Sequence, residues 1–483
     1  MKIAYISYEV SPYAKAGGLA DVAGALPKYI RDLGENIYVI MPFHKIIENN
    51  TDTSNFELVK SNLIPDSHNY KSPFSVYKSF LPNSKVTVYF IKSEELFDSK
   101  NIYEEENIFL KTSYFCDAAL KTIKELENDT LVINLNDWHT SLISVYLKTN
   151  YIEDNVLGKI STLLSIHNIG YQGLFDPNVL NYAGLPNYLF NMNALEYYGK
   201  VNVLKGGILF SDVINTVSPT YAKEIQTEEY GYGMDKILKV KSDDLFGILN
   251  GIDYSVYDPI NDPHIFAPIK SYEDKLKNKR SLQRYLNLNI NANKTIVSFI
   301  GRLFDQKGVD LISKIVEYFL LADVQFILLG TGEKNYEDYF SSLINIFPKK
   351  VSINITFDVD LAQKIYAGSD IFLMPSKYEP CGLGQMYSMR YGTVPVVRYT
   401  GGLKDTVTEF NPKDKIGTGF GFHEYNESDL LYSLLKAVYT NQKRKEDWIN
   451  LFENCMKADF SYEKTATKYI ELYKIALSKK RGF

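Results

Sequence analysis

The sequence predicts an α/β protein with two doubly wound parallel sheets, one in each half of the chain, that face each other across a cleft. Apolar strand-like runs alternate with helical patterns from residue 2 to residue 253, and the alternation starts again at residue 295. Strict strand–helix alternation is typical of parallel sheets with helices on both faces. Several of the apolar runs also end in glycine-rich or polar turns, which is where such sheets place their ligand sites.

The stretch between the two halves marks the expected domain boundary. Residues 254–293 are charged, contain prolines and lack strand-like apolar runs. A chain of 483 residues is long enough for two to three domains that each bury a core. We therefore expect a Rossmann-like N-terminal domain at 1–253, a second Rossmann-like domain at 254–460 and a separate C-terminal segment at 461–483.

Composition and charge argue against several classes of function. The net charge of −5 gives no general attraction to nucleic acid or to an anionic membrane, so neither is an expected partner. The cysteines Cys116, Cys381 and Cys455 lie far apart and form neither a disulfide framework nor a zinc-binding pattern. No targeting segment and no apolar run of membrane-spanning length is present, so we expect a cytoplasmic protein. The 38 tyrosines could stack on sugars, but packing in the core is the favoured interpretation for most of them.

The first half opens with a strand, a Gly-Gly turn and a helix. An apolar run from Lys2 to Val10 is followed by Lys15–Gly18, and helical spacing of apolar residues continues to Leu33, with Gly34 in the position of a C-terminal cap. Such a turn can bring backbone N–H groups and the Lys15 charge to an anion, or it can simply serve a tight turn. Further strands are predicted at 36–42, 85–91, 131–136, 162–166 and 212–217, and a helix at 108–126.

The second half repeats the design and contains the turn that we take as the centre of the site. Strands are predicted at 295–300, 325–329, 351–356, 371–374 and 394–397. The strand at 371–374 leads to Glu379-Pro380-Cys381-Gly382-Leu383, and the next strand leads to Thr400-Gly401-Gly402. Two glycine-containing strand-to-helix turns are therefore expected side by side, with a carboxylate at the mouth of the first. Parallel sheets build phosphate and sugar pockets in this way.

Polar residues at the strand ends supply the candidate chemistry. Arg302 and Lys307 follow one strand, five residues apart, where they could clamp a diphosphate, although a surface ion pair is the alternative. Fixed cations can stabilise a diphosphate leaving group without a metal. Glu379 is the one convincing carboxylate, and a hydrolase would need a flanking pair. The residues thus favour group transfer from an anionic donor of the nucleotide-sugar type. The candidates in the first half are Lys15, Gly18, Asp21, Asp137, His139, His167, Asn168 and Asn250.

Three of these features also have a purely structural interpretation. His167 could be a hydrogen-bonded turn histidine, but its place beside Asn168 at a strand end favours function. Asp137 and His139 could equally serve to position the helix that they begin. Asp358-Val359-Asp360 has the spacing of a metal-binding pair, yet a helix follows, so we interpret Asp360 as its N-cap. No metal site and no cofactor are expected.

Taken together, these segments resemble the bacterial glycogen synthase and plant starch synthase family. The resemblance spans nearly the whole chain in order, which makes it highly specific. It rests on Lys15-Ala-Gly-Gly-Leu-Ala-Asp-Val, Asn136-Asp-Trp-His-Thr, Ile166-His-Asn-Ile-Gly-Tyr-Gln-Gly, Gly247-Ile-Leu-Asn-Gly-Ile-Asp, Gly301-Arg-Leu-Phe-Asp-Gln-Lys-Gly, Glu379-Pro-Cys-Gly-Leu, Thr400-Gly-Gly-Leu-Lys-Asp-Thr-Val and the late Asp459-Phe-Ser-Tyr-Glu-Lys.

The resemblance implies a GT-B fold and a retaining hexosyltransferase that moves glucose from ADP-glucose to the non-reducing end of an α-1,4-glucan. It also implies a final helix that crosses back to the first domain. By position, Lys15 with Gly18 and Asp21 would bind the phosphate region of the donor, and Arg302 and Lys307 would hold the diphosphate. Glu379 would orient the sugar hydroxyls or act as the catalytic carboxylate. His167, Asn168 and Asn250 would contact the transferring glucose, the backbone of Cys381, Gly382 and Leu383 would receive it, and Phe357 would stack on the adenine.

The chain departs from the family pattern at two positions, and other functions stay open. Phe357 stands where the family often has Tyr, and Ala16 where it often has Thr. Tyr387 occupies the position of a second Glu in the wider superfamily, as it does in glycogen and starch synthases. A transferase that uses UDP-glucose is one alternative, and a catalytically silent glucan-binding scaffold is another. The scaffold is disfavoured because Lys15, Arg302, Lys307 and Glu379 are all present, and no pyridoxal phosphate motif suggests phosphorolysis.

Overall fold

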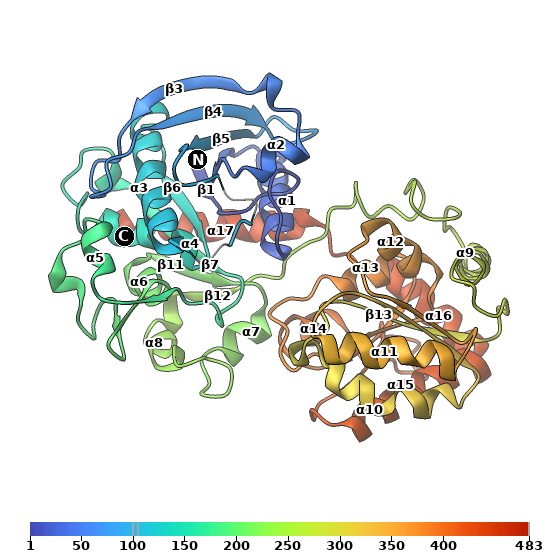
Figure 1. Cartoon of the computed structure of the whole chain (residues 1–483). Coiled ribbons are helices and arrows are strands. Elements are labelled where there is room, and N and C mark those ends of the chain that lie inside the picture. Colours follow the sequence, from blue (N-terminus) through green and yellow to red (C-terminus); the bar gives the residue numbers. More distant parts are fainter. Residues whose placement is uncertain (99–100, 104–105, 482–483) are drawn as a thin grey trace. The chain divides into compact units, whose positions relative to one another are not determined.

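The computed structural model describes residues 1–98, 101–103 and 106–481, and its contacts divide the chain into two compact units (Figure 1). Unit 1 comprises residues 1–251 together with the C-terminal segment that begins at Tyr462, and unit 2 comprises Ile252–Ser461. The division falls within two residues of the boundaries that we expected at 253/254 and 460/461. Each unit has its own sheet and is described by itself.

Unit 1 is built on a nine-stranded sheet whose strand order is β12-β11-β7-β6-β1-β2-β5-β4-β3. The chain leaves β1 to one side for β2 and later returns to its other side for β6, so the carboxyl end of β1 lies at a topological switch point. The strands are β1 (Lys2–Ile6), β2 (Asn36–Pro42), β3 (Glu57–Leu63), β4 (Phe74–Phe80), β5 (Thr87–Lys92), β6 (Val132–Asn136), β7 (Ser161–Ile166), β11 (Val213–Thr216) and β12 (Leu245–Gly247).

One edge of this sheet corrects the prediction of a wholly parallel arrangement. The strand β4 pairs antiparallel with both β5 and β3, while all other neighbours in the sheet are parallel. A hairpin connection between antiparallel strands needs no crossover helix, and residues 64–73 between β3 and β4 contain none. A second, small sheet in the order β8-β10-β9 follows the loop after β7; it contains β8 (Leu174–Phe175), β9 (Glu196–Tyr197) and β10 (Lys200–Asn202).

The helices of unit 1 follow the predicted alternation. The N–H of Gly34 donates to the carbonyl of Arg31, and a φ of +94° at this glycine confirms it as the residue that ends α1. No helix in the described ranges is long and apolar enough to cross a membrane. The helices are α1 (Gly18–Asp32), α2 (Ile46–Asn50), α3 (Ile108–Leu126), α4 (Trp138–Lys148), α5 (Val179–Tyr182), α6 (Val203–Phe210), α7 (Pro219–Glu224), α8 (Asp235–Val240) and α17 (Tyr462–Arg481).

The C-terminal helix α17 packs within unit 1, and Figure 1 shows it in red among the blue and green elements. Buried polar contacts fix its position. The Tyr473 hydroxyl donates to Asn134 Oδ1 of β6 over 2.9 Å, and Asn215 Nδ2 of β11 donates to the Tyr469 hydroxyl over 3.0 Å. Because these groups are buried, removing either partner would leave a polar atom unsatisfied. The helix is therefore bonded to the strands of unit 1 in addition to covering them.

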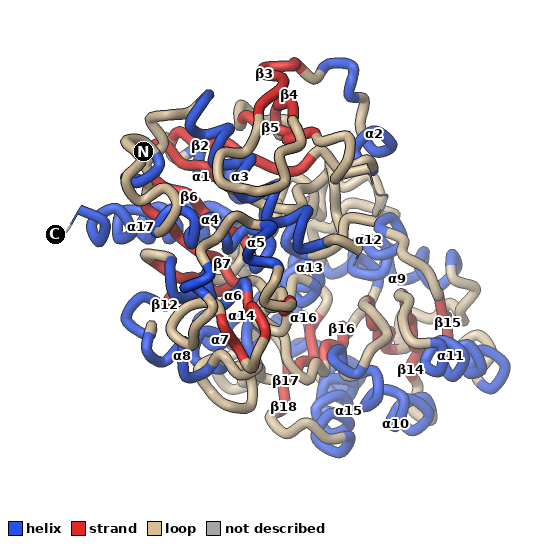
Figure 2. The backbone as a smooth tube through the Cα atoms, turned by 60° about the vertical axis from the view of Figure 1, so that its left-hand side comes forward, coloured by secondary structure: helices blue, strands red, loops and turns tan. Residues whose placement is uncertain are grey.

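Unit 2 contains a parallel six-stranded sheet in the order β15-β14-β13-β16-β17-β18, with helices around it (Figure 2). Alternate residues of β13 serve the two faces. Val297 and Phe299 pack in the larger core with α10 and α15, and Ile296 packs on the other face with α9 and α12. The strands are β13 (Thr295–Ile300), β14 (Val324–Leu329), β15 (Val351–Asn354), β16 (Ile371–Met374), β17 (Val394–Arg398) and β18 (Phe420–Phe422). The helices are α9 (Tyr272–Tyr285), α10 (Val309–Leu320), α11 (Lys334–Ile346), α12 (Val359–Gly368), α13 (Gly384–Arg390), α14 (Gly401–Thr406), α15 (Glu427–Lys443) and α16 (Lys445–Lys457).

The start of α12 corrects one prediction. Its N-cap is Asp358, whose carboxylate accepts the N–H of Leu361 over 2.9 Å, so the interpretation of Asp360 as the cap is wrong. Asp360 lies two residues further on, in the first turn of the helix, where it pairs with His264 at 2.6 Å and with Lys364. Both aspartates precede the apolar pattern, and only the backbone geometry decides which of them caps the helix.

A buried ion pair joins α9 to the sheet of unit 2. Lys279 Nζ lies 2.6 Å from Asp370 Oδ2, and each side chain is 2% exposed. The same carboxylate accepts the N–H of Ile296 at 2.7 Å, and Lys279 also donates to the carbonyl of Ala292 at 2.8 Å. Burial lowers the pKa of Lys279, which opposes the raising effect of Asp370. Such a pair is costly to break, because the remaining buried charge loses its counter-ion.

We therefore expect Lys279→Met to destabilise unit 2 by roughly 3–5 kcal/mol, because it leaves Asp370 buried without its cation. The chain has two tryptophans, so in a Trp138→Phe background the fluorescence of Trp448 reports urea unfolding of unit 2 alone. The control is Lys277→Met on the same helix, where the lysine side chain is 63% exposed. Equal midpoints for the two variants would contradict the prediction.

Candidate functional site

The loop between β1 and α1 presents Lys15 and the start of a helix. Lys15 Nζ lies 2.6 Å from Asp21 Oδ1 in the first turn of α1, and the two side chains are 39% and 27% exposed. Gly18 is the first residue of the helix, and Gly17 at its N-cap offers no side-chain cap. The structure thus brings the three predicted residues of this loop together. A helix start with free N–H groups and a nearby lysine can receive an anion.

A buried carboxylate that the sequence analysis missed holds this loop. Glu9 is 2% exposed, and its Oε2 accepts the N–H groups of Ala16 at 2.5 Å and of Gly17 at 3.0 Å. Burial raises the pKa of Glu9, and these two hydrogen bonds oppose the rise. Two amides of the loop are therefore already satisfied by the protein, so any anion would rely on Lys15 and the helix start. The sequence signal that could have identified Glu9 is its place as a charged residue within the apolar run 2–10.

Asp137 positions the loop that follows the neighbouring strand. It directly follows β6 as the N-cap residue of α4, with a φ of +55°, and its side chain makes no cap bond to that helix. Instead its Oδ1 accepts the N–H of His167 at 2.7 Å and, more weakly, that of Asn168 at 3.4 Å. Burial raises the pKa of Asp137 to about 7. These contacts do not support the interpretation that the Asp137 side chain serves to position α4.

The hydrogen bonds of His167 assign its tautomer. Nε2 lies 2.9 Å from Asn136 Oδ1, and Asn136 Nδ2 donates to the carbonyl of Ile6 at 2.9 Å, which fixes the orientation of the amide. An amide oxygen only accepts, so the proton must be on Nε2 and Nδ1 is left as an acceptor. Burial lowers the pKa of His167 to about 4, which keeps the ring neutral near pH 7. The imidazole can therefore accept a hydrogen bond from a hydroxyl group.

The other two candidates of unit 1 are buried. His139 is 8% exposed and stacks on Tyr8 with ring centroids 5.3 Å apart, with Trp138 and Tyr103 also in contact. Burial lowers its pKa to about 3. Asn250, just after β12, is 6% exposed. In the described part of the chain, His139 Nδ1 and Asn250 Oδ1 contact no hydrogen-bond partner, which is unusual for buried polar atoms.

In unit 2 the central carboxylate is held by a lysine from the neighbouring strand end. Glu379 follows β16 and Lys307 follows β13, its partner in the sheet. Lys307 Nζ lies 2.6 Å from Glu379 Oε2, which also accepts the Ser376 hydroxyl at 3.0 Å. Arg302 is exposed, and its Nη2 donates to Gln306 Oε1 at 3.3 Å. The structure therefore places a fixed carboxylate and two cations at adjacent strand ends of one sheet.

Two glycines allow the predicted turns to pack directly on each other. A Cβ on Gly401, which has a φ of +45°, would lie 2.0 Å from the carbonyl oxygen of Glu379. A Cβ on Gly402 would lie 2.0 Å from the carbonyl oxygen of Cys381. The N–H of Gly402 donates to the carbonyl of Glu379 at 3.1 Å. Thr400, the N-cap residue of α14, and Cys381 are both buried. Gly382 has a φ of +70°, and Leu383 directly precedes α13. The second turn thus supports the backbone that carries Glu379.

Phe357 is 81% exposed in the segment between β15 and α12, so its ring is accessible for stacking.

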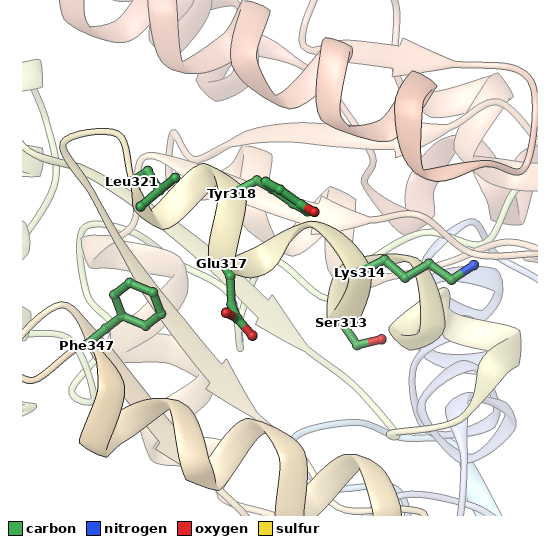
Figure 3. Close-up of a pocket in the computed structure, with 6 residues that line it drawn as sticks. All are labelled: Ser313, Lys314, Glu317, Tyr318, Leu321 and Phe347. Atoms are coloured by element: carbon green, nitrogen blue, oxygen red, sulfur yellow. The ribbon is translucent and has the colours of Figure 1, made fainter.

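In the described ranges, no group of three or more His, Cys, Asp and Glu side chains could hold a metal ion. A hollow of about 370 Å³ lies beside α10 (Figure 3) and contains none of the predicted site residues. Its lining is Ser313, Lys314, Glu317, Tyr318, Leu321 and Phe347.

The comparisons with known proteins first define a class. Residues 2–240 match the family model described as the starch synthase catalytic domain, and residues 286–451 match that of glycosyl transferases group 1. With its two α/β units, the protein is a glycosyltransferase of the GT-B fold, as predicted. A sucrose-phosphate synthase from Thermosynechococcus elongatus, 16% identical over 98% of each chain with a TM-score of 0.61, supports the fold alone.

Relatives of full length then define the family. A glycogen synthase from Petrotoga mobilis is 79% identical over the whole of both chains, and one from Thermotoga maritima is 48% identical over 99% of each. The catalytic domain of starch synthase IV from Arabidopsis thaliana, solved with ADP and acarbose bound, is 31% identical over 99% of each chain with a TM-score of 0.90. The chain belongs to the glycogen synthase family. The roles of the individual site residues stay predictions.

The packing of the two turns leads to a stability test. We expect Gly402→Ala to destabilise unit 2 by at least about 1–3 kcal/mol, since the new methyl group would overlap the backbone of Cys381. The measurement is the midpoint of thermal unfolding by calorimetry. Gly301→Ala is the control within the same unit, because its Cβ would meet only the ring edge of Phe299, at 3.3 Å. A midpoint for Gly402→Ala that matches this control would refute the role of the glycine.

Proposed function

We propose that this protein is a hexosyltransferase of glycogen biosynthesis that transfers glucose, with retention, from ADP-glucose to the non-reducing end of an α-1,4-glucan and releases ADP. The observation that carries the proposal is a sequence identity of 49–79% over the full length with proteins named glycogen synthase. The bound ADP and acarbose of the starch synthase IV structure support a nucleotide and a glucan as the ligand types. The proposal needs no metal or cofactor, and it places the protein in the cytoplasm.

The cations of unit 2 provide the leaving-group chemistry in this proposal. As the bond between glucose and phosphate breaks, negative charge develops on the diphosphate. The exposed fork of Arg302 can bind two phosphate oxygens, and Lys307 can donate to a third while it keeps its contact with Glu379. Cations that are already in position stabilise the transition state without reorganisation. In unit 1, the helix start beside Lys15 would offer N–H groups and a cation to an anionic group.

The contacts of Glu379 favour a role in orienting the sugar over a role as nucleophile. In the part of the chain that the structure describes, both contacts of the carboxylate use Oε2, which leaves Oε1 to accept sugar hydroxyls. A carboxylate that is paired with a lysine is also a weaker nucleophile than a free one. Its charge and fixed position would still favour the positive character of the oxocarbenium-like transition state.

The neutral loop of unit 1 would bind the transferring glucose. His167 Nδ1 can accept a sugar hydroxyl, and Asn168 and Asn250 add amide groups after β7 and β12 of the same sheet. Phe357 would stack on the adenine, where the loss of the usual tyrosine hydroxyl costs little if the ring face makes the contact. The roles of these residues follow from the family resemblance together with their exposure and hydrogen bonding.

The choice of donor is the direct test of the function. We expect ADP release from ADP-glucose with glycogen as acceptor, with kcat/KM about 2- to 12-fold higher than for UDP-glucose, because adenine offers a larger face to Phe357 and aromatic contacts contribute about 0.5–1.5 kcal/mol. The assay measures nucleoside diphosphate release with each donor, with and without EDTA. Preference for UDP-glucose would overturn the assignment of the donor, and no release with either would overturn the function.

Substitution of Glu379 separates the roles that the carboxylate could have. We expect Glu379→Ala to lower kcat by about 10²–10³-fold, because it removes a preorganised group from the transition state. Glu379→Gln should keep more activity than the alanine variant if hydroxyl orientation dominates, since the amide oxygen still accepts. Steady-state kinetics with ADP-glucose and glycogen provide the measurement.

The matched control for these variants is Glu424→Gln, an exposed glutamate of the same unit, which should leave kcat unchanged. Undiminished turnover in Glu379→Ala would remove this residue from the catalytic assignment. Equal loss in the alanine and glutamine variants would favour a role for the negative charge itself.

A further inference from the structure

A buried amide joins the His167 loop to a turn that is far away in the sequence. Gln172 is 8% exposed, and its Nε2 donates to the carbonyls of Ile169 at 3.2 Å and of Tyr232 at 2.9 Å. Its Oε1 accepts from Asn202 Nδ2 at 2.7 Å, so the amide is satisfied on both sides. A satisfied buried network of this kind fixes backbone positions. The turn that contains Tyr232 is thereby fixed relative to the loop that carries His167.

Tyr232 sits in this turn with a strained backbone. Its φ is +49°, in the left-handed region that tyrosine rarely adopts, and the residue is 44% exposed. The ring lies over Gly170: a Cβ built on that glycine would be 3.7 Å from Tyr232 Cζ and 3.2 Å from Asn168 Oδ1. Strained residues persist where the surrounding structure holds them, and they cluster at ligand sites. Stability alone would favour Asn or Gly at this backbone position.

We propose that the ring of Tyr232 is a stacking surface for the acceptor glucan, an inference that rests on the proposed function. A glucose unit has an apolar face of C–H groups and a rim of hydroxyls, and an accessible tyrosine ring presents a matching apolar face with a polar tip. Asp235 lies against Gly231 of the same turn, and the other neighbours there, Gly170, Gln172 and Tyr197, are uncharged. They suit a neutral sugar chain better than the diphosphate of the donor.

The position of Tyr232 beside the His167 loop distinguishes it from other exposed tyrosines. Its ring lies beside Gly170, and its carbonyl accepts from Gln172 of the same loop. Gly170 comes two residues after Asn168, which with His167 is proposed to bind the transferring glucose. A glucan whose end reaches that glucose must pass over the neighbouring surface of the loop. Tyr171 on the same loop is 57% exposed and adds a second aromatic group there. The strain at Tyr232 is therefore assigned to acceptor binding.

Replacement by asparagine separates binding from stability. Asparagine tolerates a positive φ, so Tyr232→Asn should unfold at a Tm equal to or above that of the wild type. It removes the ring, so we expect the KM for glycogen and for maltotetraose to rise roughly 2- to 12-fold, with the KM for ADP-glucose within about twofold. Tyr232→Phe should retain the wild-type KM values, because the ring face makes the contact. Tyr182→Asn, at a tyrosine of unit 1 that is 55% exposed on α5, is the control and should leave acceptor KM unchanged.

The outcomes can be told apart. An unchanged acceptor KM in Tyr232→Asn, with wild-type turnover otherwise intact, would overturn the inference and leave the proposed function standing. A fall in Tm together with a rise in KM for both substrates would mark a purely structural residue and would also overturn it. If the wild-type protein fails to extend glycogen from ADP-glucose, the proposed function falls, and the inference falls with it.

Discussion

Carboxylates at strand ends that bind the backbone of a neighbouring segment are the interaction on which both units depend. Parallel sheets bring the carboxyl ends of their strands to one edge, but the loops that follow have no ladder to hold them. In unit 1, Glu9 binds the amides of the Lys15 loop and Asp137 binds those of the His167 loop. In unit 2, Asp370 lies just before β16, at the opposite edge of its sheet, where it binds the start of β13 and the lysine of α9. Glu9 closes a local loop, whereas Asp137 and Asp370 join segments that are distant in the chain.

This arrangement has an energetic cost that explains why it is confined to a few places. Burial raises the pKa of both Glu9 and Asp137, so their ionised forms are disfavoured by desolvation and recovered only in part by the backbone N–H groups. The compensation is preorganisation: the loops that carry Lys15 and His167 are held in place before any ligand arrives. A site that must stabilise a short-lived charge benefits from groups that need no reorganisation.

Elements with local signals could be predicted from the sequence, and those decided by distant contacts could not. The bounds of β2, α3 and β13 agree with the predicted ranges because apolar runs and their ends define them. The antiparallel edge at β3 and β4 lacks such a signal, since pairing direction depends on the path of the connection. The cap of α12 was assigned to Asp360 rather than Asp358, because both residues suit the position chemically.

The same division holds for the candidate site. Motifs and the family resemblance supplied the positions of Lys307 and Glu379, but their direct contact, between residues 72 apart in sequence, comes only from the register of β13 and β16. Glu9 lies outside the quoted motifs, and Gln172 lies within the His167 motif but was not singled out, since the importance of both lies in the backbone groups that they bind. Side chains that do chemistry leave a sequence signature more readily than side chains that position them.

The distribution of charge gives the two units different binding chemistry. In unit 2, Arg302 is exposed and Lys307 stands beside a single carboxylate, so the strand ends offer cationic donors to phosphate. Around His167, by contrast, the imidazole is neutral because burial lowers its pKa to about 4. The adjoining groups are amides, tyrosines and the buried carboxyl of Asp137, whose pKa burial raises to about 7. In the proposed function, the diphosphate would therefore find its chemical match at the cations of unit 2, and neutral sugar groups would find theirs at the His167 loop of unit 1. Because the contacts that hold each loop lie within its own unit, a substitution that alters one loop can leave the contacts of the other unit intact.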